Sequence, residues 1–330
     1  MRFLYITDTH LRGNAPKNRI DNFIVNLKNK IDEVIDLAYK YQVDYILHGG
    51  DFFDSPSPSL AAVGDFLKLF TKENFPPIYA ISGNHDVFAA NLNTLPRTML
   101  GFLDKLGFLK LIMPGEKIML EKNDITVQLT GQSYYYDIDR EDEHNAYIVK
   151  KGNADIAIHM VHGMLVNDPG FPGQDFTLID HILDTEADIT LSGHNHLGFG
   201  IIEKENRLFV NPGALIRISS DKKEMSRKVS VALIKIERKK PEVDLISLTS
   251  ALPGDLVLSR EAIEAEAERS KKIAGFVAEI SKATNLERTD AERIIEEIAR
   301  AQNINLEVRK EALERISKVQ ERLENGERGA

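Results

Sequence analysis

The 330-residue chain contains no cysteine. This absence excludes disulfide scaffolds, thiolate metal sites and a cysteine nucleophile, and it fits a reducing compartment. Any metal ion must therefore be held by His, Asp, Glu or Asn side chains. The sequence also lacks an apolar run of the roughly 18 residues that a membrane-spanning helix needs. Its N-terminus has a short apolar run but no small-residue cleavage site, so we interpret this run as a first strand and not as a signal peptide. We expect a cytoplasmic protein with no membrane segment.

An excess of positive charge is missing as well. The 51 Asp and Glu residues outnumber the 42 Lys and Arg residues, and the net charge is -9. The chain therefore lacks the global positive field of many nucleic-acid binders, so a nucleic-acid ligand would need local basic patches or bound metal. With 42% hydrophobic and 28% charged residues, the composition is that of a globular protein. The length allows one large domain and a smaller one.

Apolar runs alternate with helical periodicity in the first hundred residues. The run Phe3–Ile6 ends just before Asp8, and apolar residues then recur at spacings of three and four between residues 20 and 38. The same order of strand, polar loop and helix follows the runs 45–47 and 78–81. This alternation predicts βαβ units and a largely parallel sheet, in which ligands collect at the carboxyl ends of the strands.

The second half of the chain is richer in strands. We predict seven strands there, at residues 125–131, 154–161, 188–192, 199–203, 208–211, 229–237 and 243–248. They are enough for a second sheet packed on the first. Around Leu252 the composition changes, and the chain beyond it is charged, rich in alanine and helical in its periodicity. We therefore predict a main domain over residues 1–250, a linker over 251–258 and a helical module over 259–330.

The helical module has two interpretations. It either completes the fold as a bundle or docks on a partner, because narrow apolar stripes on short charged helices bury poorly alone. The candidate contact stripe consists of Leu313, Ile316, Val319 and Leu323.

Five polar loops that follow apolar runs carry groups suited to metal. They are Asp8-x-His10, Gly50-Asp51-x-x-Asp54, Gly83-Asn84-His85-Asp86, His162-Gly163 and Gly193-His194-Asn195-His196. Each loop alone has an ordinary structural explanation, such as a helix cap or a turn. Together, with glycine before three of them to let the backbone approach an ion, they predict a metal centre.

This set of residues suits two divalent ions roughly 3.5–4 Å apart, which together clamp the oxygens of an in-line phosphoryl displacement. One carboxylate must bridge both ions, and Asp51 is the best candidate because ligand pairs lie on either side of it in the sequence. Mixed imidazole, carboxylate and carboxamide ligands favour manganese, iron or zinc over magnesium or calcium. Manganese is our first choice.

Spacing helps to choose among the histidines. In Asp8-x-His10, as in the loop at residues 194–196, the period of two of an extended chain would direct both side chains to one side. His159 and His162, three residues apart, should point to opposite faces. We therefore interpret His162 as a ligand and His159 as a core histidine.

In this order the motifs resemble the calcineurin-like metallophosphoesterases, over residues 1 to about 250. Within that superfamily the sequence is most similar to the SbcD-type DNA repair nucleases, through the loops at residues 50–59 and 83–86. The resemblance implies an α/β fold of four layers (αββα), with two β-sheets face to face, helices outside and a C-terminal helical extension.

The resemblance also implies how the ligands are shared. One ion would be held by Asp8, His10, Asp51 and His196, and the other by Asp51, Asn84, His162 and His194. His85 would protonate the leaving oxygen, and Asp86 would orient His85.

Differences between this sequence and other branches of the superfamily exclude one class of substrate. Phosphoprotein phosphatases of the superfamily carry Arg-Gly after the second Asp of the GDxxD loop and Glu after GNH, whereas this chain has Ser55-Pro56 and Asp86. A phosphoprotein substrate is therefore not expected. The Asp at position 54 matches the bacterial SbcD type, whereas the family's capping domain looks absent or reduced here.

The leading functional prediction is a manganese-dependent DNA nuclease of repair or recombination, either exonuclease or endonuclease. The basic residues expected to contact DNA are Arg12, Lys17, Arg19 and Arg217. The alternatives are a small-molecule phosphodiesterase for cyclic or dinucleotide substrates and, less favoured, a scaffold that binds no metal.

The resemblance further implies two protein partners. One is an SbcC-type ATPase that binds the C-terminal helices, and the other is a second copy of the chain. The apolar patch proposed for a homodimer consists of Phe66, Leu67, Phe70, Leu100, Leu103 and Leu106.

Overall fold

The computed structural model describes residues 1–70, 73–140, 144–169, 175–261, 268–275, 304–305, 307–312 and 314–315. The chain divides into a compact unit Met1–Ser259 and a second unit Arg260–Ala330. In the second unit, residues 268–275 and 307–312 are helical, and Arg269 Nη2 lies 2.5 Å from Glu311 Oε2. The predicted docking stripe, Leu313, Ile316, Val319 and Leu323, lies outside the described residues.

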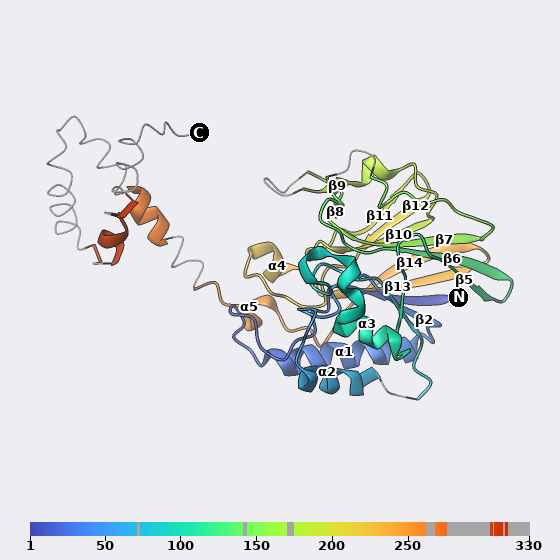
Figure 1. Ribbon diagram of the computed structural model, residues 1–330, viewed down its shortest axis with the longest axis horizontal. Coiled ribbons are helices and arrows are strands. Elements are labelled where there is room, and N and C mark those ends of the chain that lie inside the picture. Colours follow the sequence, from blue (N-terminus) through green and yellow to red (C-terminus); the bar gives the residue numbers. More distant parts are fainter. Residues whose placement is uncertain are drawn as a thin grey trace. The chain divides into compact units, whose positions relative to one another are not determined.

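The first unit contains two six-stranded sheets (Figure 1). The first sheet has the order β14-β13-β1-β2-β3-β4, and its strands β1 to β4 are parallel. Strand β13 pairs with β1 in the antiparallel sense. The bounds are β1 Arg2–Ile6, β2 Tyr45–His48, β3 Ile78–Ala80, β4 Lys110–Leu111, β13 Ser230–Glu237 and β14 Lys240–Ser247.

The second sheet has the order β11-β12-β10-β7-β6-β5. Its four strands β12, β10, β7 and β6 are parallel, whereas β11 and β5 are antiparallel edge strands. The bounds are β5 Lys117–Lys122, β6 Ile125–Gln132, β7 Ile156–Gly163, β10 Ile189–His194, β11 Gly200–Lys204 and β12 Arg207–Asn211, and a small separate sheet pairs β8 Leu165–Val166 with β9 Thr177–Leu178. The hairpin turn Asn123-Asp124 joins β5 to β6, with both residues at positive φ.

Helices cover the outer face of the first sheet (Figure 1). The helix α1 forms because apolar residues recur every three or four positions, and Leu27, Ile31 and Val34 are fully buried. The side chain of Asn22 caps its N-terminus by accepting from the Val25 N–H. The bounds are α1 Phe23–Lys40, α2 Leu60–Leu67, α3 Met99–Lys105, α4 Lys222–Ser226 and α5 Gly254–Val257, with the 3-10 helices η1 Lys68–Phe70, η2 Phe88–Ala90, η3 Leu92–Arg97 and η4 Ile179–Ile182. None of the helices among the described residues has the length and apolar character to cross a membrane.

The two sheets pack face to face through an apolar layer. Phe3 and Leu47 of the first sheet lie in one buried cluster with Leu129 and Leu191 of the second. The predicted fold class, an α/β sandwich of two sheets, is confirmed. The outer face of the second sheet departs from the predicted layer of helices. Among the described residues it is covered by η4 and the segment around Tyr147, and by no α-helix.

The structure of the first unit differs from two predictions, the apolar homodimer patch and the linker over residues 251–258. Of the six residues proposed as a homodimer patch, Phe66, Phe70, Leu100 and Leu103 are at most 5% exposed in the core beneath the first sheet, and Leu67 packs against that core. Leu106 alone is strongly exposed, at 63%, so these residues form no apolar surface patch and that prediction is wrong. Their spacing reflects packing within the chain. The predicted linker 251–258 contains α5 and the buried residues Val257 and Leu258, and it packs as part of the first unit.

His159 on β7 is a buried core residue, as its position in the strand predicts. Its Nε2 donates to the Ala146 carbonyl at 2.9 Å, and its Nδ1 lies 2.9 Å from Thr130 Oγ1. Burial lowers the pKa of His159 to about 4. The folded chain therefore keeps this ring neutral at pH values where an unfolded histidine is protonated.

We predict a loss of stability in acid that traces to this ring. Between pH 6.5 and 4 the unfolded chain binds a proton at His159 that the folded chain does not, so the stabilisation present above pH 6.5 is lost as the pH falls. Urea unfolding of the metal-free protein should give a slope against pH that is smaller in His159→Gln by up to about 1.4 kcal/mol per pH unit. Equal slopes in the two proteins would contradict the assignment.

Candidate metal centre

Loops from both sheets meet at the carboxyl ends of the parallel strands. Asp8 and His10 follow β1, and Asp51 follows β2. The Asp8 N–H donates to the Gly50 carbonyl at 3.1 Å and the His10 N–H to the Asp51 carbonyl at 2.9 Å. From the second sheet, the His194 N–H reaches the carboxylate of Asp8 at 3.2 Å. The structure therefore brings together residues that are 186 positions apart.

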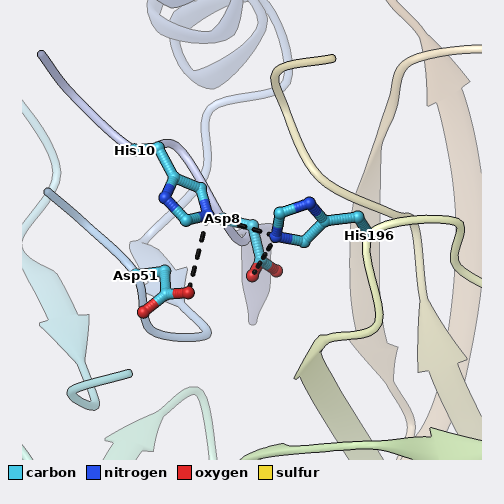
Figure 2. Close-up of side chains that lie close together, drawn as sticks. All are labelled: Asp8, His10, Asp51 and His196. Atoms are coloured by element: carbon cyan, nitrogen blue, oxygen red, sulfur yellow. Dashed lines mark hydrogen bonds and ion pairs between the residues drawn. The ribbon is translucent and has the colours of Figure 1, made fainter. Parts of the chain in front are cut away.

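Four predicted ligands form a first group (Figure 2). One ligand atom each from Asp8, His10, Asp51 and His196 lies within 4.8 Å of all the others. His10 Nε2 is 3.1 Å from His196 Nε2 and 3.5 Å from Asp51 Oδ2. His196 Nε2 is 3.5 Å from Asp8 Oδ1. This is the set that the resemblance assigns to one ion.

A second group shares Asp51 with the first. Asp51, His162 and His194 also place one ligand atom each within 4.8 Å of one another. His162 Nε2 lies 3.4 Å from Asp51 Oδ2 and 3.3 Å from Asn84 Oδ1. Asp51 thus occupies the position predicted for the bridging carboxylate.

Hydrogen bonds fix the orientation of the His162 ring. Its Nδ1 lies 2.7 Å from the Gly49 carbonyl, which can only accept, so Nδ1 carries the proton. The lone pair of the neutral ring therefore lies on Nε2, which faces Asp51. A backbone acceptor behind the ring is the usual partner of a metal-binding histidine, because it fixes the tautomer.

The centre holds buried anions beside imidazoles. Asp8 and Asp51 are at most 1% exposed. Burial raises the pKa of each carboxyl, but His196 beside Asp8 and His162 beside Asp51 outweigh burial and lower both pKa values below the usual range. Asp51 in turn outweighs burial at His162 and raises the pKa of that ring to about 9. Buried carboxylates whose oxygens face several ring nitrogens fit divalent cations, and this set of nitrogen and oxygen donors suits manganese, iron or zinc.

Two glycines let the ligands approach closely. A Cβ on Gly83 would lie 2.1 Å from Asp51 Oδ1, and one on Gly50 would lie 2.3 Å from His162 Nδ1. Gly50 also has φ +96°. The expectation that these loops need glycine is confirmed, because any side chain would displace Asp51 or His162.

The extended geometry predicted for the two His-containing loops is wrong. Asp8, His10 and His194 have φ values of 50°, 40° and 69°, which place them in the left-handed region. Such a backbone is unfavourable for residues other than glycine and clusters at functional sites. Turns, rather than the period of a strand, therefore direct these side chains to the centre.

His85 lies at the rim of this centre. Its Nδ1 donates to the Asp54 carbonyl at 3.0 Å, and its ring stands edge-on to His10 with ring centroids 4.8 Å apart. Asp86 does not orient His85. Its buried carboxylate instead accepts from the N–H groups of Phe52, Phe53 and Gly83 at 2.9–3.1 Å, which ties the two loops together. Burial and the charge of Asp51 raise the pKa of Asp86 to about 7.

Asp54 lies in the predicted Gly50-Asp51-x-x-Asp54 loop but received no role from the sequence. Its Oδ1 lies 3.4 Å from His10 Nδ1, and its Oδ2 forms an ion pair with Arg12 Nη1 at 2.7 Å. With its carbonyl on His85, Asp54 contacts both a ligand candidate and the acid candidate. Its place as the second Asp of the GDxxD loop was the available signal.

The four residues predicted to contact DNA differ in how far their side chains are exposed. Lys17 is exposed, and Arg12 is partly exposed beside Asp54. Arg19 and Arg217 are 9% and 6% exposed, and both are used inside the protein, so their assignment to DNA is wrong. Arg19 pairs with Asp21 at 2.7 Å, and Arg217 donates to backbone carbonyls of residues 227 and 252. They hold loops together.

The two sheets bring together, at the carboxyl ends of their parallel strands, a cluster of Asp and His side chains that could hold metal ions. The profile of the calcineurin-like phosphoesterases matches residues 1–198, which is more than half of the chain. The chain belongs to this family. The predictions of family and fold class are therefore confirmed, and the prediction of metal-dependent phosphoester chemistry is confirmed at the level of the family.

Among its relatives, the DNA double-strand break repair protein Mre11 of Methanococcus maripaludis is 30% identical over 37% of this chain and 31% of that protein. Mre11 of Halobacterium salinarum is 25% identical over 59% of this chain and 47% of that protein. The metallophosphoesterase YhaO of Bacillus subtilis, described as uncharacterized, is 26% identical over 66% of this chain and 52% of that protein. The matches thus span about half or less of these relatives.

Proposed function

We propose that this protein is a metal-dependent nuclease that hydrolyses phosphodiester bonds of DNA in repair or recombination. The observation that carries the proposal is the sharing of Asp51 by two groups of ligands at the junction of the sheets. The Mre11 relatives support DNA as the substrate, since both are described as DNA double-strand break repair proteins.

The residues would divide as the resemblance implies, with manganese as the preferred metal. Asp8, His10, Asp51 and His196 would hold one ion, and Asp51, Asn84, His162 and His194 the other. Two divalent ions in such a site supply Lewis-acid activation of water and of the phosphoryl group.

The acid of the reaction would be His85. Because its Nδ1–H is held by the Asp54 carbonyl, a second proton on this ring sits on Nε2, from which it can pass to a leaving oxygen. Asp54 would fix the orientations of the His10 and His85 rings relative to each other, because it contacts both. A positioned acid of this kind contributes about 10²–10⁴-fold.

The proposal extends to partners of the whole protein. An SbcC-type ATPase would bind the C-terminal helical module, and a second copy would form a homodimer through a surface other than the buried patch. Light scattering at micromolar concentration tests the homodimer directly.

The test is cleavage of end-labelled single- and double-stranded DNA with manganese, beside bis-p-nitrophenyl phosphate as a small diester. We expect both kinds of substrate to be hydrolysed with manganese and neither with excess EDTA. Hydrolysis of the small diester with DNA left intact would favour the alternative, a phosphodiesterase for small nucleotides, or a nuclease that needs its ATPase partner. Supplying that partner separates the two.

A further inference from the structure

A cavity of about 360 Å³ adjoins the metal centre. It lies between the segment after His162, the loop that carries His194 and His196, and the helix α4. Asn195, which lines it, is the residue between two ligand candidates. The lining residues used below are Asn167, Asn195, Leu197, Phe199, Lys223 and Arg227. A cavity of this size is within the range that takes a small organic ligand.

Two cations on one side of the cavity have unused hydrogen-bond donors. Arg227 Nε and Nη2 donate to the carboxylate of Glu224 at 2.8–2.9 Å and Nη2 also donates to the Ile216 carbonyl, whereas its buried Nη1 has no hydrogen-bond partner among the described residues. Lys223 is exposed, and its ammonium forms no ion pair within the described part of the chain. A guanidinium N–H without a protein acceptor keeps a donor free, and an anion is the strongest partner for such a donor.

The rest of the lining is mostly apolar and amide, with the hydroxyl of Ser226 and one carboxylate, that of the exposed Asp168, which accepts from Asn167 Nδ2 at 2.9 Å. Leu197 and Phe199 supply an apolar surface, and Phe199 is braced from behind by the cluster that contains Phe209. Asn167 and Asn195 supply amide groups. An aromatic ring beside amides and cations is the combination that binds a nucleotide, since the ring contacts the base or sugar and the cations bind the phosphate.

We infer that this cavity binds a nucleotide of the DNA strand that flanks the phosphate at the metal centre. The flanking phosphate lies at Lys223 and Arg227, and the base or sugar lies against Phe199. The inference rests on the proposed nuclease function and names the subsite that separates a polynucleotide from a simple diester. Lys223 and Arg227 also supply local positive charge in a chain of net charge -9, in the role that the buried Arg217 cannot fill.

Lys223→Ala tests the phosphate contact, with Lys222→Ala as the matched control from the same helix. Lys222 is exposed and does not line the cavity. Binding of a fluorescent single-stranded oligonucleotide is measured with manganese in the His85→Gln background at several salt concentrations. We expect Lys223→Ala to weaken binding several-fold and to reduce the slope of log K against log salt by about 0.7, the value for one single-strand phosphate contact. Lys222→Ala should change neither.

Ser226→Trp tests the cavity itself, because Ser226 is exposed at its edge and an indole would fill it. We expect the ratio of kcat/KM for DNA to that for bis-p-nitrophenyl phosphate to fall at least about fivefold. Equal salt slopes for the two lysine variants, or an unchanged ratio in Ser226→Trp, would overturn the inference. If the wild type cut only the small diester even with its ATPase partner supplied, the nuclease proposal would fail, and the binding slopes would still decide the subsite.

Discussion

Asp51→Asn is expected to abolish hydrolysis of both DNA and bis-p-nitrophenyl phosphate. Asp51 is the one carboxylate in both ligand groups, and its Oδ2 faces His10 and His162 at 3.5 and 3.4 Å. An amide carries no charge and offers one oxygen, so neither group stays complete. We expect a loss of at least about 10³-fold in kcat/KM, or about 4 kcal/mol of transition-state stabilisation.

The variant should remain folded, because the amide oxygen can still accept the His85 N–H that Asp51 Oδ1 accepts at 2.8 Å. Titration calorimetry with manganese should show weakened binding at both sites. Asp65→Asn is the matched control, since Asp65 is an exposed carboxylate that pairs with Lys28 on the surface. Two tight manganese sites in Asp51→Asn would show that Asp51 does not bridge.

His85→Gln should separate substrates by their leaving groups. A DNA strand leaves as an alkoxide that must be protonated, whereas p-nitrophenolate is stable without a proton. We expect kcat for DNA to fall about 10²–10⁴-fold, the range for loss of a general acid. Hydrolysis of bis-p-nitrophenyl phosphate should fall much less.

The measurement is the ratio of the two losses under identical manganese concentrations. Metal binding itself should be nearly unchanged in His85→Gln, because the side chain of His85 bonds to the Asp54 carbonyl and only its backbone N–H, which the substitution keeps, reaches the ligand candidate Asp51. His181→Gln serves as the control, since His181 is exposed and outside the centre. Equal losses for both substrates would contradict the role as acid and favour a role in transition-state stabilisation.

Local patterns in the sequence were enough for the fold class. The three- and four-residue spacing of α1 and the apolar runs of β1, β2 and β3 reflect contacts between near neighbours and the burial of one face. The order of these elements predicted parallel strands, whose carboxyl ends meet at one edge. Residue types alone also defined the chemistry of the centre, because a chain without cysteine leaves only nitrogen and oxygen ligands.

Other features escaped because they depend on contacts between distant segments. A sequence does not distinguish an arginine that faces solvent from one that donates to a carbonyl inside the protein. The burial of Arg19 and Arg217 therefore follows only from the arrangement of the folded loops. Asp86 follows His85 directly, yet it binds N–H groups 33 and 34 positions away.

What the sequence alone determined is the family, the two-sheet sandwich and the set of Asp, Asn and His side chains that can hold metal. Only the tertiary structure decided that Asp51 belongs to both ligand groups, that left-handed turns direct Asp8, His10 and His194, and that Asp54 supports His85. The physical reason is that periodicity records which face of an element is buried, whereas a ligand's direction depends on backbone turns and on hydrogen bonds between loops brought together by the pairing of strands.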